Sequence, residues 1–473
     1  MEATSRNFKR NIQDALVDPD LQQALGNLKA GFVVNRANAV AALPEFDQLR
    51  DEARAIKNHT LAHLDLYLER FEERVAESGG QVHWCRTPAE ACATILDICR
   101  SVDAKMVTKG KSMIAEEIGL NDFLEKNDIA PMETDLGEYI IQLRHEAPSH
   151  IIAPAIHVTK KQVADSFYAT HEALDPDRSL EEPRALIDEA RAMLRQTYLD
   201  ADVGITGANF LIAETGSTVI VTNEGNGDLT QTLPKVHIVT ASLEKVVPTL
   251  EDATTILRVL ARSATGQEFA NYTTFSTGPR RPGDLDGPEQ FHVVLLDNGR
   301  SALLGTQFQD ILRCIRCGAC MNHCPVYGAV GGHAYGWVYP GPMGAVLTPT
   351  LIGVDQSGDL PNASTFCGRC EEVCPMHIPL PKMMRHYREQ EFERGMTPGA
   401  ARFALKLWAF LAARPRLYQA LTGIEMRVLG ALGRKRGRFG WLPFAGGWTR
   451  HRDFPAPQGK TFQQRWAERG GAR

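Results

Sequence analysis

Apolar residues recur at helical spacing through the first 78 residues, and the pattern changes after that point. Leu61, Leu64, Leu68 and Phe71 are three or four positions apart with charged residues between them, as expected for helices with one buried face. From residue 79 onwards, short apolar runs alternate with longer stretches of helical pattern. The runs typical of strands cover residues 81–85, 104–108, 129–133, 236–240 and 291–297. Because strands alternate with helices, we expect a parallel α/β sheet over residues 79–300.

Capping and turn residues mark the ends of several elements. Thr87 followed by Pro88 predicts the start of a helix, because threonine caps a helix and proline fits its first turn. Ser112 predicts a second helix start, and Gly216 predicts the turn between two paired strands. The paired strands are expected at 210–213 and 218–222, and further helices at 185–198, 252–263, 378–395 and 403–411.

The overall composition is that of an ordinary soluble globular protein. The chain has 473 residues, of which 43% are hydrophobic and 23% are charged, and its length predicts roughly three domains. No apolar stretch reaches the roughly 18 residues that a membrane-spanning helix needs, and the first residues contain no apolar signal core. We therefore expect a protein of the reducing cytoplasm, where thiols remain unpaired.

Positive charge is concentrated near the C-terminal end. Residues 401–473 contain fifteen Lys and Arg against three acidic residues, although the whole chain has a net charge of −5. The most basic patch is 433–438. Such a patch is typical of docking to an acidic redox partner or to an anionic membrane surface, and the alternative is a solvated tail. We expect no binding of nucleic acid.

Seven of the ten cysteines lie in two short runs. The first run has the spacing CxxCxxCxxxCP and the second has the spacing CxxCxxxCP. In bacterial two-cluster ferredoxins, three close cysteines bind one iron–sulfur cube, and the cysteine before proline binds the other cube. The spacing therefore predicts two interlocked clusters. The assignment is Cys314, Cys317, Cys320 and Cys374 for cluster 1, and Cys324, Cys367 and Cys370 for cluster 2.

Cluster 2 has one thiol fewer than a complete run would supply. The position three residues before Cys367 is Ser364 instead of cysteine. The second cluster is therefore either a 4Fe-4S cluster with an oxygen or external fourth ligand, or a 3Fe-4S cluster. Structural zinc is the alternative to clusters altogether, but zinc needs two CxxC-type pairs and no cysteine before proline. The other cysteines, Cys85, Cys92 and Cys99, are expected to be buried small apolar residues.

A polar stretch between residues 143 and 161 is dense in groups that can bind an anion or exchange a proton. It contains Arg144, His145, Glu146, His150 and His157. The alternative interpretation is a solvated loop with local salt bridges.

Several long stretches resemble the lactate utilization protein B family, the iron–sulfur subunit of a bacterial L-lactate oxidation system. These stretches are residues 111–120, 133–139, 207–216 and 222–226, together with both cysteine runs. The resemblance implies an α/β lactate-utilization domain, similar in fold to sugar-phosphate isomerases and CoA transferases. It implies that an α-helical, ferredoxin-like domain with two 4Fe-4S clusters follows, with the seven cysteine ligands assigned above.

The expected organisation has four parts. They are a helical region at 1–78 packed on the α/β domain, the lactate-utilization domain at 79–300, the two-cluster domain at 301–395 and a basic tail at 396–473.

The resemblance implies a redox subunit that passes electrons from L-lactate through the clusters as pyruvate forms. Its implied partners are the companion proteins A and C and an electron acceptor, either free or associated with the inner membrane. The chain shows no sign of a flavin or nicotinamide site, so catalysis is expected to need the partner subunits.

Two alternative functions remain open for the α/β domain. It is either a scaffold for the companions or a catalyst that binds or oxidises a 2-hydroxy acid. In the second case Arg144 is the candidate to hold the carboxylate, His145 or His150 the base, and Glu214 the nucleophile by analogy with CoA transferases.

Overall fold

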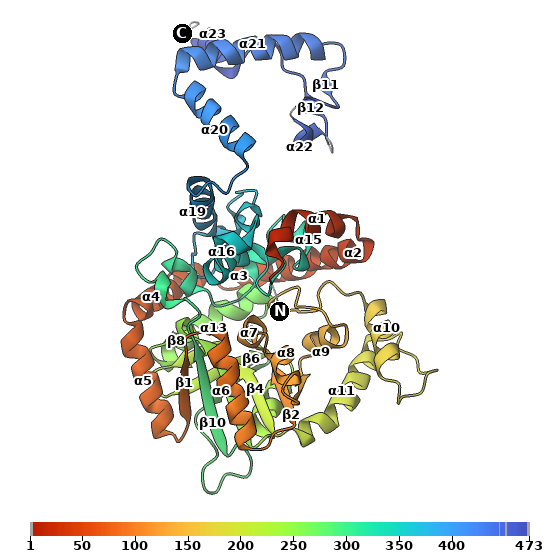
Figure 1. The fold of residues 1–473 in the computed structure, drawn as a ribbon, viewed down its shortest axis with the longest axis vertical. Coiled ribbons are helices and arrows are strands. Elements are labelled where there is room, and N and C mark those ends of the chain that lie inside the picture. The colour runs from red at the N-terminus through yellow and green to blue at the C-terminus, as the bar shows by residue number, and fades with distance from the viewer. Residues whose placement is uncertain (1–2, 444, 450–451, 471–473) are drawn as a thin grey trace. The chain divides into compact units, whose positions relative to one another are not determined.

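The computed structural model describes residues 3–443, 445–449 and 452–470. The chain forms two compact units, residues 1–388 and 389–473. Figure 1 shows the α/β part of the first unit in orange to green and the helices of the second unit in blue.

A six-stranded parallel sheet forms the centre of the first unit. Its strand order is β1 (Gln81–Cys85), β10 (Gln290–Leu296), β7 (Val236–Ser242), β4 (Val203–Gly207), β2 (Met106–Gly110) and β3 (Ala130–Glu133). Every neighbouring pair in this sheet is parallel. The carboxyl ends of all six strands therefore lie at one edge, where ligands of open α/β sheets usually bind.

Both faces of this sheet are covered, which explains why its central strands β10, β7 and β4 are buried along nearly their whole length. One face packs against α6 (Pro88–Ser101), α7 (Met113–Ile118) and α8 (Leu120–Glu125). The other face packs against α5 (Leu64–Glu77) and a second sheet. Alternate residues of one strand serve the two faces: Val236 and Ile238 belong to the first core, whereas Val239 and Ala241 belong to the second.

The second sheet has four strands in the order β8 (Val246–Val247), β5 (Phe210–Ile212), β6 (Ser217–Thr222) and β9 (Tyr272–Ser276). β5 and β6 form an antiparallel pair, and Gly216 between them has a φ of 69°. Only glycine adopts that conformation without strain. The remaining helices around the α/β part are α4 (Phe46–Ala62), α9 (Leu136–Leu143), α10 (Lys160–Thr170), α11 (Pro183–Asp200), α12 (Asn226–Thr232) and α13 (Leu250–Ala264).

The cysteine region folds from short helices and packs against the start of the chain. Its helices are α14 (Ala319–Asn322), α15 (Tyr327–Val330), α16 (Gly341–Ile352), α17 (Val354–Ser357), α18 (Arg369–Glu372) and α19 (Leu380–Glu393). The N-terminal helices are α1 (Phe8–Val17), α2 (Pro19–Leu28) and α3 (Val34–Ala41). Phe8, Leu25 and Phe46 share one hydrophobic core with Cys317 and Cys374, and in Figure 1 α1 and α2 lie beside α15. The first helices thus help to build the cysteine region.

The second unit contains α20 (Gly399–Ala412), α21 (Pro415–Gly433), α22 (Gly446–Thr449), α23 (Phe462–Gly470) and a short β11–β12 pair (Arg438–Phe439 and Phe454–Pro455). No residue of α20 is buried, and Phe403 and Trp408 are 69% and 61% exposed. Among the described residues, none of the helices combines the length and apolar character needed to cross a bilayer.

The α/β class and its parallel sheet are confirmed. The predicted strand at 81–85 and the helix that begins after the Thr87 cap are confirmed, with the Thr87 side chain accepting a hydrogen bond from the Glu90 N–H. The central strand β4 was not predicted, because its two glycines are typical of loops. The structure gives the reason for one of them: a Cβ on Gly204 would lie 1.7 Å from the Thr230 carbonyl oxygen of α12. The four-part division of the chain remains a prediction.

Candidate iron–sulfur site and adjoining pocket

The two cysteine runs adopt the same backbone conformation. In the first run Arg316 and Gly318, on either side of Cys317, have φ values of 59° and 73°. In the second run Phe366 and Gly368, on either side of Cys367, have φ values of 53° and 80°. Each loop then enters a one-turn helix, α14 or α18. The runs are structural repeats, in which Cys317, Cys320 and Cys324 correspond to Cys367, Cys370 and Cys374, and Cys314 corresponds to Ser364.

Four thiols from both runs line one small cavity. They are Cys314, Cys317, Cys320 and Cys374, and apolar residues such as Ile151 and Met376 complete the wall. Burial, and then the neighbouring thiolates of Cys314, Cys317 and Cys374, raise the pKa of the Cys320 thiol well above its usual value. The fold thus places Cys374, the last cysteine of the second run, beside the first three cysteines of the first run. The assignment to cluster 1 requires this arrangement.

The remaining three cysteines form a second group. Burial, and then the thiolates of Cys324 and Cys367, raise the pKa of the Cys370 thiol to about 12. Cys367 is exposed, and hydrogen bonds from the Arg369 N–H and the Thr365 side chain lower the pKa of its thiol. Ser364, half-buried, accepts a hydrogen bond from the Phe366 N–H at 3.0 Å through its hydroxyl oxygen. The ligand roles of all seven cysteines remain a prediction.

A buried tyrosine tests whether these residues fit an iron–sulfur group. Tyr335 is fully buried, and its hydroxyl has no hydrogen-bond partner among the described residues. Burial, and then Cys324, Tyr327, Cys320 and Cys370, raise its pKa well above the usual value, and Tyr335 belongs to the same hydrophobic core as Cys317, Cys324 and Cys370. An unpaired buried hydroxyl costs about 1–3 kcal/mol, and the sulfur atoms of a cluster would accept its hydrogen bond. The site fits the clusters that the spacing predicts.

The thiols are not arranged as a site for a single metal ion. Within the described ranges, no three His, Cys, Asp or Glu side chains are grouped closely enough to hold one ion. Cationic side chains lie around the cysteine loops instead. The Arg36 guanidinium donates to the Val373 carbonyl at 3.0 Å, and that of Arg50 donates to the Cys374 carbonyl at 2.8 Å. Positive charge there favours thiolates over thiols.

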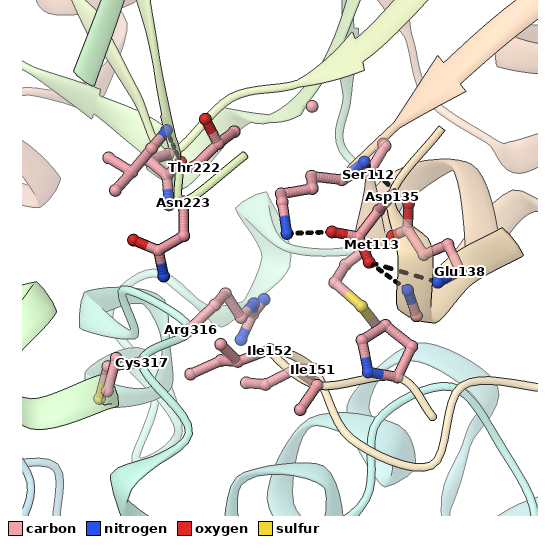
Figure 2. Close-up of a pocket in the computed structure, with 18 of the residues that line it drawn as sticks. Ser112, Met113, Asp135, Glu138, Ile151, Ile152, Thr222, Asn223, Arg316 and Cys317 are labelled. Atoms are coloured by element: carbon pink, nitrogen blue, oxygen red, sulfur yellow. Dashed lines mark hydrogen bonds and ion pairs between the residues drawn. The ribbon is translucent and has the colours of Figure 1, made fainter. Parts of the chain in front are cut away.

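A cavity of about 580 Å³ adjoins the first thiol group. Residues after the carboxyl ends of β2, β3, β4 and β7 form one side of it, among them Ser112, Asp135 and Asn209. Arg316 and Cys317 form part of the other side, and Figure 2 shows the Arg316 side chain reaching between Asn223 and Ile152 toward the open centre. Cys317 also lines the small cavity of the four thiols. The large pocket and the proposed cluster 1 therefore share a wall.

Acidic and basic side chains pair along the strand-end side of this pocket. The Lys111 ammonium contacts the Asp135 carboxylate, and its distance to Glu224 is 3.4 Å. Glu138 accepts a hydrogen bond from the Lys111 N–H at 2.9 Å. Burial, and then the carboxylates of Glu133 and Asp135, raise the pKa of Glu138 well above its usual value. This side can therefore both donate and accept hydrogen bonds.

The proposed catalytic residues of the polar stretch do not lie at this pocket. The Arg144 guanidinium pairs with Glu146 at 2.7 Å, and His157 pairs with the same carboxylate at 2.7 Å. Burial alone would raise the pKa of Glu146, but the hydrogen bonds from His157 and Arg144 lower it to about 2. These three residues line a separate cavity of about 160 Å³.

The other candidates have structural contacts. His150 is fully buried, and its Nδ1 accepts from the backbone N–H groups of Ile152 and Ala153. Its Nε2–H therefore donates to the Asn322 side chain at 2.9 Å, and burial lowers the pKa of His150 to about 4. Glu214 is exposed and accepts from the Leu250 N–H at the start of α13. The structure does not bring Arg144, His145, His150 and Glu214 together at one cavity. Cys85, Cys92 and Cys99 are buried, as expected.

Sequence reasoning missed Lys245 and Arg316 in the large pocket. Arg316 lies inside the first cysteine run, between Cys314 and Cys317, and its spacing carries no separate sequence signal. Lys245 follows the apolar strand β7, and a charged residue just after a buried parallel strand is the signal that could have identified it.

Known protein families match most of this chain, from residue 68 to residue 471. Residues 68–296 match the LUD domain, residues 310–378 match the 4Fe-4S dicluster domain, and residues 381–471 match the C-terminal domain of lactate utilisation protein B. The α/β domain followed by paired thiol groups thus defines an iron–sulfur protein of the electron-transfer class.

Curated relatives identify the family. Lactate utilization protein B of Bacillus licheniformis is 42% identical over 99% of this chain and 98% of its own, and that of Bacillus subtilis is 41% identical over 98% and 96%. An uncharacterized electron transport protein of Escherichia coli, YkgF, is 41% identical over 98% and 97%. The chain belongs to the lactate utilization protein B family.

Proposed function

We propose that this chain relays electrons during the oxidation of L-lactate to pyruvate, through two clusters held by the seven cysteines of its paired runs. The observation that carries the proposal is the common cavity of Cys314, Cys317, Cys320 and Cys374, which joins both runs around one site. The names of the relatives connect the family with lactate utilization and electron transport.

The clusters would supply one-electron redox chemistry, and oxidation of lactate releases two electrons and two protons. Cys314, Cys317, Cys320 and Cys374 would hold one cluster, and Cys324, Cys367 and Cys370 the other. Because Ser364 replaces the cysteine of the repeat, the second cluster would be either a 4Fe-4S cluster with an oxygen or external fourth ligand, or a 3Fe-4S cluster. The protein itself would bind the clusters in an apolar setting and exclude water from the first of them.

Iron analysis and cluster spectroscopy test this proposal. The anaerobically purified chain should contain seven to eight irons, and Cys320→Ser should lose about half of them together with lactate-dependent electron transfer in the complete system. Cys92→Ser, a buried cysteine far from both runs in the sequence, is the matched control and should keep both clusters. Full electron transfer by Cys320→Ser protein that lacks cluster 1 would reject the proposal.

The proposed partners are the companion proteins A and C and an electron acceptor. This chain offers no flavin motif, so the substrate-oxidising step would need those companions. Reduction of the clusters by L-lactate should therefore occur only when the companions are added to the purified chain. Reduction by lactate in the isolated chain would instead make the α/β domain the catalyst.

We further propose that the second unit binds an anionic membrane surface near the acceptor. Its helix α20 exposes Phe403, Leu405 and Trp408, and α21 exposes Ile424 and Leu432. Exposed aromatic and apolar side chains next to clustered Lys and Arg are typical of helices that lie in the interface of an anionic bilayer.

Vesicle sedimentation tests the membrane proposal. The full chain should sediment with phosphatidylglycerol vesicles at low salt and not with phosphatidylcholine vesicles, and Trp408→Ser should weaken the binding. Leu66→Ser, which changes an exposed leucine of the first unit, is the control. Equal behaviour on both lipids would contradict the proposal.

A further inference from the structure

The large pocket beside the first thiol group is lined by only one of the seven assigned cysteines, Cys317. The four stretches that carry the family resemblance in the α/β domain all contribute to its wall, through Lys111, Asp135, Asn209 and Asn223 among others. At about 580 Å³ it is in the range of small-molecule sites. Four separate segments thus converge on a cavity that the electron-relay role leaves unexplained.

A buried ammonium group faces this pocket without a partner. Lys245 lines the cavity and is only 8% exposed. Within the part of the chain that the structure describes, its Nζ makes no hydrogen bond and no ion pair. Its neighbour Lys57 differs in this respect, because the Lys57 ammonium donates to the backbone carbonyls of Glu244 and Val246. The Lys245 side chain is largely buried while its ammonium faces the cavity without an acceptor from the protein, so an anion in the pocket could form a charge-assisted hydrogen bond with it.

Arg316 places a second cation on the same side. Its Nη2 lies 3.2 Å from the Glu244 carboxylate and its guanidinium lies 5.1 Å from the centre of the Tyr339 ring. Glu244 is also shared with Arg300, whose Nε is 3.3 Å away. One carboxylate thus faces two guanidinium groups, and Arg316 retains N–H donors directed at the pocket centre (Figure 2).

We propose that this pocket binds a small organic carboxylate, whose carboxylate group contacts Lys245 and Arg316. The carbon end lies against Ile152 and Met113, and a hydroxyl or oxo group meets the polar side chain of Asn223. The ligand is a 2-hydroxy or 2-oxo acid, and this choice of class rests on the proposed role in lactate oxidation. The anion site itself rests only on the geometry. The acid is held next to Cys317, at the wall shared with cluster 1.

The competing explanation is that Lys245 and Arg316 only balance the negative charge of cluster 1. Both lie near Cys314, whose thiolate interacts with each of them. The two explanations differ in one measurable respect. Charge balance changes the reduction potential of the cluster but creates no saturable affinity for an added acid.

Calorimetry on the full, cluster-containing chain distinguishes these explanations. L-lactate and pyruvate should bind saturably, and lactamide, which lacks the charge, should not bind. Lys245→Met should weaken binding by about tenfold or more, since hydrogen bonds to charged groups contribute about 1.5–3 kcal/mol. Lys245→Arg should retain part of the affinity. Lys235→Met is the matched control, because Lys235 is exposed and precedes the opposite end of the same strand β7.

The outcomes separate this inference from the proposed function. No saturable binding of either acid overturns it, as does equal binding by the wild type and Lys245→Met. A Lys245→Met protein with altered cluster potential but unchanged affinity assigns Lys245 to charge balance and overturns it too. Because binding is measured on oxidised protein without companions, it does not depend on lactate-driven reduction; absent clusters would reject the proposed function instead. Lys245→Gln replaces Lys245→Met if the latter fails to fold.

Discussion

At the scale of single residues, buried charges connect the α/β domain to the cysteine region. Arg300 is 1% exposed and makes two hydrogen bonds to Glu117, of 2.9 and 2.5 Å. The Tyr339 hydroxyl donates to the same carboxylate at 2.6 Å. This contact joins the end of the α/β domain, α7 and the segment between the two cysteine runs. Arg300 is thus paired within the protein, whereas Lys245 and Arg316 face the pocket.

Loss of Arg300 should therefore be strongly destabilising. Arg300→Leu leaves the Glu117 carboxylate buried without its cation, and we expect the free energy of unfolding to fall by about 3–5 kcal/mol. Urea unfolding under anaerobic conditions measures the change. Adding Glu117→Gln removes the unpaired charge and should restore part of the stability. A double variant no more stable than the single one would contradict this explanation.

His237 should make the stability depend on pH. It is 1% exposed, shares a hydrogen bond of 2.8 Å with the Thr206 hydroxyl, and burial lowers its pKa to about 3 from the usual 6.5. Below pH 6.5 His237 binds a proton in the unfolded chain, whereas in the folded chain it remains neutral until the pH approaches 3. Stability should therefore fall as the pH decreases from 6.5 towards 3, by at most about 1.4 kcal/mol per pH unit from this residue.

The pH effect is measured by unfolding at pH 7 and pH 5.5. His237→Gln should show a smaller loss of stability between these two values than the wild type does. An unchanged difference would show that His237 is not neutral in the folded protein. His150 and His292, whose pKa values burial lowers to about 4, keep part of the dependence in the variant.

At the scale of elements, the contact between β4 and α12 depends on a missing side chain. The backbone of α12 lies so close to Gly204 that an added Cβ would be 1.7 Å from the Thr230 oxygen. Gly225, at the start of α12, has no atom within 4 Å of such a Cβ, and its φ is −73°. A side chain is therefore sterically excluded at Gly204, whereas Gly225 has room for one.

Gly204→Ala should lower the thermal midpoint sharply, because the helix must move away from the centre of the sheet. Gly225→Ala is the control and should change the midpoint by little. Circular dichroism on both purified variants makes the comparison. Similar midpoints would mean that α12 adapts to the extra methyl group.

At the scale of the whole first unit, the N-terminal helices and the cysteine loops depend on each other. The Ser5 hydroxyl donates to the Tyr335 carbonyl at 2.9 Å, and Arg36 and Arg50 donate to carbonyls of the second cysteine run. Phe8 and Leu25 share a core with the cysteines. The strands of the six-stranded sheet belong largely to other cores.

Removal of iron should therefore loosen the start of the chain as well as the cysteine loops. After anaerobic chelation, we expect faster amide hydrogen exchange in α1, α2 and residues 311–380. Strand β7 should keep its protection and serves as the internal control. Unchanged exchange in α1 and α2 would show that these helices are held without the clusters.

The sequence by itself determined many of the helices and strands, although not β4, and it indicated the chemistry expected of the cysteine runs. Periodicity and caps act over a few residues, so α6 and the β5–β6 pair could be predicted from local pattern. The spacing of the cysteines, with Ser364 as the one departure, already indicated two interlocked sites. Local interactions were sufficient to predict the grouping of cysteines within each run, because a short loop fixes the positions of its own side chains.

Only the tertiary structure decided which distant residues meet. Among the described residues it left the Tyr335 hydroxyl without a partner, and it placed Lys245 and Arg316 at one pocket. It also separated Glu214 from Arg144, which the sequence had grouped by chemistry alone. The physical reason is that these contacts depend on the order of parallel strands and the packing of whole layers, and neither is encoded in any short stretch of the chain.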